Sequence, residues 1–174
     1  MKYLTLSQVN NALERASTKG HIKNRTRNYL IIKTLVESGL RASELVSLVP
    51  KNINFSEKVL HIKGKGEKIR SVYIPRDLAI QLKGFIETNK IRQKDPVFPL
   101  TREGLYRITS KFALTNPHSL RHTYAIFMLE NNEVHVRFLQ EQMGHESLDT
   151  TQVYLDIKEF RSQRKKILDG VIPS

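Results

Sequence analysis

Hydrophobic and polar positions alternate mostly with helical spacing along the chain. Thr5–Gln8 has the form of a capping box, in which two side chains satisfy backbone N–H groups of the first helical turn. Leu6, Val9 and Leu13 follow at spacings that put them on one helix face. The pattern therefore predicts a first helix that starts at this box.

The next segments predict two more helices. A second helix is expected from about Asn24 to Ser38, followed by Gly39, a residue that typically ends helices in the left-handed conformation. A short helix from about Ala42 to Leu48 ends before Pro50.

A β-hairpin is predicted in the middle of the chain. Lys58–Ile62 and Ile69–Ile74 are strand-like, and Lys63–Lys68 between them is highly charged and contains glycine. Further helices are predicted at Asp77–Thr88, Arg102–Lys111, His118–Glu130, Val134–Met143, Asp149–Tyr154 and Lys158–Leu168. The predicted fold class is therefore mainly α with a small antiparallel β-hairpin or sheet (α+β). Without repeats or a Pro/Gly/Ser-rich linker, residues 1–174 are expected to form a single domain.

The charge balance points to a polyanionic partner. Lys and Arg number 29 against 17 Asp and Glu, a formal net charge of +12, and the pI is about 10.0. This favours nucleic acid over the alternatives of an anionic membrane surface or a merely solvated basic surface. The absence of cysteine excludes disulfides, thiolate zinc sites and cysteine nucleophiles. With no long apolar run and no secretory signal, a cytoplasmic location is expected.

Six residues can together act on a phosphodiester. Arg41 and Arg121 offer planar, permanently charged forks that can clamp one phosphate and stabilise its transition state. Lys65, in the hairpin turn, can protonate a leaving oxygen as general acid. Tyr154 supplies an oxygen nucleophile, which a neighbouring base or positive charge must activate.

Two histidines complete the set. His118 lies three residues before Arg121 and shares its helix face, and His145 is a donor or proton carrier.

Each residue taken alone also has a purely structural interpretation. Arg41 can be an ordinary surface arginine, and Arg121 can form an ion pair with a nearby carboxylate. Lys65 can be a solvated lysine in a charged turn. His118 can simply be a residue at a helix start, and His145 can belong to a helix-ending turn. Tyr154 can be an aromatic residue of the core.

A metal or nucleotide cofactor is not predicted. His118 and His122 are four residues apart, but the segment lacks the Glu of the H-E-x-x-H motif and no dense carboxylate cluster accompanies it. We interpret His122 as a helix residue that supports the fold. Gly64-Lys65-Gly66 lacks the spacing of a P-loop.

The ordered set resembles the tyrosine recombinases, the phage integrase and Xer recombinase family. The resemblance lies in Gly39–Leu45 around Arg41, the Lys65 hairpin, the His118–Thr123 box, Met143-Gly144-His145, and Thr150–Tyr154. It covers about Leu4 to Leu168 and implies the catalytic-domain fold of that family. Met143 replaces the commoner Leu, a change that nearly conserves volume.

The resemblance implies a reaction and a partner. Tyr154 is expected to cleave double-stranded DNA through a 3′-phosphotyrosyl intermediate, and the released 5′-hydroxyl rejoins strands without metal, ATP or a small-molecule substrate. The alternatives are type IB topoisomerase-like relaxation, a non-catalytic DNA-binding protein, and a phosphodiesterase acting on other nucleic acids.

Two expectations concern organisation. The separate N-terminal core-DNA-binding domain that most members carry is expected to be absent, in a fragment or in a natural single-domain member. Ile157, Phe160, Arg164, Ile167 and Leu168 suggest an amphipathic C-terminal helix. It packs on its own domain or, as the resemblance implies, on a neighbouring protomer on DNA.

Overall fold

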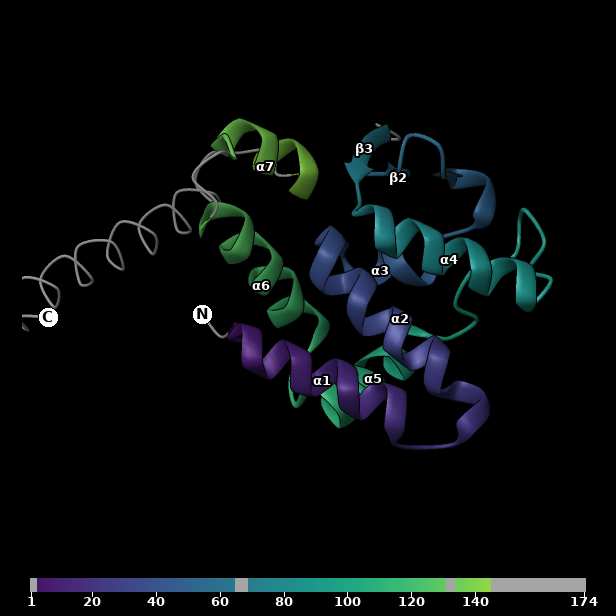
Figure 1. Cartoon of the computed structure of the whole chain (residues 1–174). Helices are drawn as coiled ribbons and strands as arrows, with labels where there is room; N and C mark the ends of the chain where they lie inside the picture. The colour runs from purple at the N-terminus through teal and green to yellow at the C-terminus, as the bar shows by residue number, and fades with distance from the viewer. Residues whose placement is uncertain (1–2, 65–68, 131–133, 145–174) are drawn as a thin grey trace, which may run out of the picture.

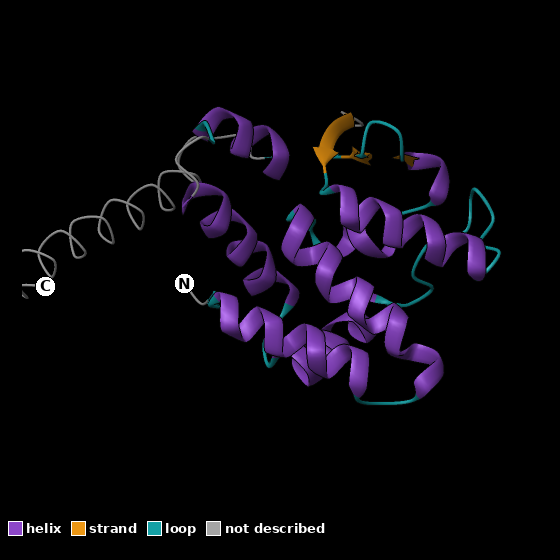
Figure 2. Ribbon diagram, in the orientation of Figure 1, coloured by secondary structure: helices purple, strands orange, loops and turns teal. Residues whose placement is uncertain are grey.

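The computed structural model describes residues 3–64, 69–130 and 134–144. Their elements are α1 (Leu6–Thr18), α2 (Ile22–Ser38), α3 (Ala42–Val46), a 3-10 turn η1 (Pro50–Asn52), β1 (Ile53–Asn54), β2 (Val59–Lys63), β3 (Ile69–Tyr73), α4 (Arg76–Thr88), α5 (Arg102–Ala113), α6 (Pro117–Glu130) and α7 (Val136–Met143). The predicted mainly helical fold with a small antiparallel sheet is confirmed. Helices form most of the molecule, and the strands lie together at one end (Figures 1 and 2).

The start of α1 confirms the predicted capping box. Thr5 Oγ1 accepts a hydrogen bond from the Gln8 backbone N–H at 3.3 Å, and Gln8 Oε1 accepts one from the Thr5 N–H at 2.8 Å. Val9 is buried and Leu13 packs against the core, but Leu6 is 64% exposed. Leu6 therefore lies outside the buried face, because none of the described elements covers it there.

Helix α2 is the central element of the core. Its second half is buried almost continuously, from Leu30 to Val36, and such a helix must be covered on all sides. α1, α4, α5 and α6 contact it, as the ribbon around it shows (Figure 1). A smaller apolar cluster joins α6 to α7 through Tyr124, Leu129, Leu139 and Met143.

The sheet has three antiparallel strands in the order β1-β2-β3. Leu60 of β2 pairs with Ile53 of β1 and with Val72 of β3. The predicted hairpin is confirmed as β2 and β3, whereas β1, only two residues long, was not predicted.

The outer edge of β3 is covered by α7. Gln142 Oε1 accepts from the Tyr73 N–H at 2.9 Å, and Gln142 Nε2 donates to the Ser71 carbonyl at 3.2 Å. One buried amide side chain thereby pairs backbone groups that a sheet edge would otherwise leave open, and it fixes α7 beside the hairpin.

The remaining predicted helices agree closely where the structure describes them. Asp77–Thr88, Arg102–Lys111, His118–Glu130 and Val134–Met143 correspond to α4, α5, α6 and α7. The helices predicted at 149–154 and 158–168 lie outside the described residues. Within residues 3–64, 69–130 and 134–144, no helix is both long and apolar enough to cross a membrane.

Candidate active site

Arg41 lies where the chain turns from α2 into α3. Gly39 ends α2 with φ of 63°, and a Cβ there would lie 2.4 Å from Cδ1 of Tyr124 on α6. Leu40 is fully buried, and Arg41 follows as the N-cap residue of α3 with its side chain 43% exposed. The Gly-Leu-Arg sequence thus makes a tight turn, anchors it in the core and directs the arginine toward solvent.

Arg121 reaches the same region from α6. This helix starts with Pro117 at its first position, and Asn116 Oδ1 accepts from the Ser119 N–H at 2.9 Å. Arg121, on the buried side of the next turn, donates from Nη1 to the Gly39 carbonyl and from Nη2 to the Met143 carbonyl, the latter at 2.5 Å. Its guanidinium therefore links the end of α2 to the end of α7.

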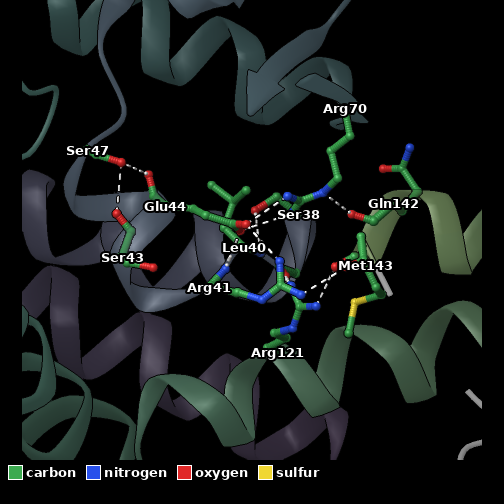
Figure 3. Close-up of polar contacts among 12 residues, drawn as sticks. Ser38, Leu40, Arg41, Ser43, Glu44, Ser47, Arg70, Arg121, Gln142 and Met143 are labelled. Carbon is green, nitrogen blue, oxygen red and sulfur yellow. Dashed lines mark hydrogen bonds and ion pairs between the residues drawn. The ribbon is translucent and has the colours of Figure 1, made fainter. Parts of the chain in front are cut away.

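The two arginines converge on adjacent peptide carbonyls. Arg41 Nη2 donates to the Gly144 carbonyl at 3.0 Å, next to the Met143 carbonyl that Arg121 binds. Figure 3 shows the Arg41 and Arg121 side chains close together beside Met143. Gly144 ends α7 with φ of 61°. The guanidinium groups of Arg41 and Arg121, which come from separate helices, are thereby held close together at the segment that precedes His145.

Glu44 is the acidic partner of this site. Its Oε1 accepts from Arg41 Nη1 at 3.0 Å and from Arg70 Nη1 at 2.7 Å. Its Oε2 accepts from the Arg41 backbone N–H at 2.7 Å and from Arg70 Nη2 at 2.9 Å. Burial alone raises the pKa of Glu44, but the Arg70 and Arg41 hydrogen bonds and the Arg70 charge outweigh it and lower the pKa below its ordinary value.

Arg70 connects the hairpin to both neighbouring helices. Besides Glu44 it binds the Gln142 carbonyl through Nε at 3.1 Å, and its side chain is only 14% exposed. A Cβ at Gly144 would lie 2.9 Å from Arg70 Cδ. The glycine therefore lets Arg70 lie directly against the end of α7.

Tyr124 on α6 packs against Gly39 at the end of α2, next to this site. It is buried, and burial raises the pKa of its hydroxyl to about 12, with the Arg121 charge acting in the opposite direction. It stays neutral at physiological pH and serves as packing for the close approach of Gly39.

His118 lies on the first turn of α6 and is exposed. Its ring meets the His122 ring edge to face, with centroids 4.1 Å apart, and His122 is buried, which agrees with a supporting role. Among the described residues, no three or more potential metal-ligating side chains gather in one place.

The other three predicted site residues, Lys65, His145 and Tyr154, lie outside the described residues. Glu44, Arg70 and Gln142, by contrast, were not predicted as site residues. A signal for Glu44 was present, because a Glu three residues after a helix N-cap is the capping-box position.

Comparison with known proteins agrees with the fold. The family model described as "Phage integrase family" matches residues 2–160. The tyrosine recombinase XerA of Pyrococcus furiosus is 35% identical over 172 residues, which cover 86% of this chain and 58% of XerA. The chain thus spans little more than half the length of this relative.

Solved structures give the same result. The XerA recombinase crystal structure superposes with a TM-score of 0.78 at 25% identity, covering 94% of this chain and 64% of that one. The XerH site-specific recombinase bound to difH substrate superposes with a TM-score of 0.71 at 25% identity, covering 88% and 50%. The chain has the tyrosine recombinase catalytic-domain fold, and it belongs to the phage integrase family.

Proposed function

We propose that this chain is a site-specific recombinase that cleaves and rejoins double-stranded DNA through a 3′-phosphotyrosyl intermediate at Tyr154. The observation that carries the proposal is the convergence of Arg41 and Arg121 at the carbonyls of Met143 and Gly144. Fixed, charged donors from two helices suit the oxygens of a phosphate that gains negative charge as it reacts. The DNA-bound state of XerH, a relative in fold, supports DNA as the partner.

The reaction divides among the six residues. The Tyr154 oxygen attacks the phosphorus, the bond to the 5′-oxygen breaks, and Lys65 gives that oxygen its proton. Arg41 and Arg121 bind the non-bridging oxygens, and His118 and His145 add hydrogen bonds or carry the tyrosine proton. The phosphotyrosine conserves the energy of the broken bond, so rejoining by a 5′-hydroxyl needs neither ATP nor metal.

The test is covalent trapping with a nicked suicide substrate that contains the target site. The unmodified chain is expected to form a denaturant-resistant protein–DNA adduct, and Tyr154→Phe is expected to form none. Tyr106→Phe, which removes the hydroxyl of an exposed tyrosine on α5, is the matched control and should react normally. A chain that binds DNA without forming an adduct would contradict the proposal.

A second assay separates strand exchange from simple relaxation. A recombinase yields products joined between two sites, whereas a type IB topoisomerase-like enzyme relaxes supercoiled DNA that carries no site. Relaxation of site-free plasmid, without joint products, would overturn site-specific recombination while leaving the cleavage chemistry intact.

We also propose that the chain self-associates on DNA through its C-terminal segment. Support comes from the amphipathic spacing of Ile157, Phe160, Ile167 and Leu168. Sedimentation of the chain on DNA carrying two half-sites should show cooperative binding, which Phe160→Ser should reduce. Independent, non-cooperative filling of the two half-sites would contradict it.

A further inference from the structure

Two arginine side chains of the site share the Glu44 carboxylate unequally. Arg70 binds both oxygens of Glu44 side by side, at 2.7 and 2.9 Å, whereas the Arg41 side chain binds one of them at 3.0 Å. Side-on, two-point pairing is the strongest geometry between a guanidinium and a carboxylate. Glu44 is therefore bound mainly by Arg70.

Burial makes this distribution of charge important. The Glu44 side chain is 7% exposed and that of Arg70 is 14% exposed, whereas that of Arg41 is 43% exposed. Where water is largely excluded, the charge of Glu44 acts strongly on its neighbours. The two arginines and the one glutamate together have a net charge of +1. Because Arg41 is the more exposed arginine and makes the weaker contact with Glu44, we assign this excess charge to Arg41.

From this geometry we infer that Arg70 is a positioning residue for DNA cleavage: it neutralises Glu44 and so leaves the charge of Arg41 available to a phosphate. The inference rests on the proposed function. Without Arg70, Glu44 has Arg41 as its closest cationic partner, and a buried carboxylate holds such a partner firmly. Arg41 then pairs with Glu44 rather than with DNA.

The inference predicts opposite effects for two substitutions that each break the same ion pair. Arg70→Gln removes the charge but keeps a hydrogen-bond donor, and it should slow single-turnover cleavage about tenfold or more. Adding Glu44→Gln to Arg70→Gln removes the competing carboxylate, so the double variant should cleave faster than Arg70→Gln alone. A purely structural role for the Arg70–Glu44 pair predicts instead that any rescue of the rate follows a matching recovery of stability, so urea denaturation is measured on the same variants.

A conservative variant provides a second test. Arg70→Lys keeps the positive charge but loses the two-point pairing with Glu44, so its cleavage rate should lie between those of the unmodified chain and Arg70→Gln. Arg92→Gln, which breaks an exposed pair with Asp95, is the control and should not change the rate. DNA dissociation constants, measured in the Tyr154→Phe background, should change far less than the cleavage rates.

The outcomes separate the two claims. If the unmodified chain forms the adduct while Arg70→Gln matches its rate, the positioning role of Arg70 fails and the proposed function stands. A double variant no faster than Arg70→Gln, or a lysine variant as slow as the glutamine variant, also overturns it. If the unmodified chain forms no adduct, the proposed function fails and this inference fails with it.

Discussion

Arg41 and Arg121 are held by neighbouring peptide carbonyls at the end of α7, Arg41 by that of Gly144 and Arg121 by that of Met143. They differ sharply in burial: Arg121 is 5% exposed, while the Arg41 side chain is 43% exposed. The same pair of residues is therefore expected to respond differently to the same substitution.

Arg121→Ala should cost both stability and cleavage, whereas Arg41→Ala should cost mainly cleavage. Loss of Arg121 leaves the buried Gly39 and Met143 carbonyls without this donor, at about 1–3 kcal/mol in the free energy of unfolding. Urea denaturation and single-turnover cleavage, measured on both variants, check this. Arg137→Ala, which removes an exposed charge from α7, is the control. Equal stability losses for Arg41→Ala and Arg121→Ala would contradict the difference in burial.

Gly39→Ala should destabilise the domain by more than about 1 kcal/mol, because the residue has positive φ and its Cβ would overlap Tyr124. Gly84→Ala is a matched control, since nothing lies within 4 Å of a Cβ at that position in α4. In a helix interior this change should stabilise by about 0.5–1 kcal/mol. Thermal unfolding of both variants should therefore shift in opposite directions, and a shared direction would refute the close packing of α2 on α6.

Glu44 should make stability depend on acid pH. Its folded pKa is lowered from 4.5, so its ionised form contributes stability above pH 4.5 that is lost as the pH falls through the folded pKa. Unfolding free energies measured from pH 6 down to about pH 3 should fall less steeply for Glu44→Gln than for the unmodified chain. Glu14→Gln, on the exposed face of α1, should leave the slope unchanged. Identical slopes for all three proteins would contradict the pairing of Glu44 with Arg70.

Gln142→Leu should loosen the attachment of α7 to the hairpin. The substitution removes both bonds to β3 and leaves the Tyr73 N–H and the Ser71 carbonyl without this partner, at about 1–3 kcal/mol. Amide hydrogen exchange at Tyr73 should accelerate, whereas Gln140→Leu, two residues earlier on α7, should leave it unchanged. Unaltered exchange at Tyr73 in Gln142→Leu would show that the edge of β3 is protected by another group.

Features set by neighbouring residues could be predicted from the sequence, and features set by distant ones could not. The Thr5–Gln8 box, the Gly39 helix end and the hairpin each depend on a few adjacent residues, and all three are confirmed. The exposure of Leu6 and the two-residue strand β1 depend on where the rest of the chain packs. Helical spacing predicted the face but not whether anything covers it.

The candidate site shows the same division. The ordered motifs pointed to Arg41 and Arg121, which the fold brings together, but not to the acceptors that hold them. Those acceptors are backbone carbonyls, which have no signature in the sequence. The pairing of Glu44 with Arg70 joins a helix start to a strand, so it became visible only in three dimensions.

The most direct measurement is to identify the residue that becomes joined to DNA. The trapped adduct would be digested with nuclease and protease and its peptides analysed by mass spectrometry. We predict a nucleotide attached through its 3′-phosphate to the peptide that contains Tyr154, with no such peptide from Tyr154→Phe. A phosphonucleotide on any other residue, or an adduct that survives in Tyr154→Phe, would contradict the assignment of Tyr154 as the nucleophile.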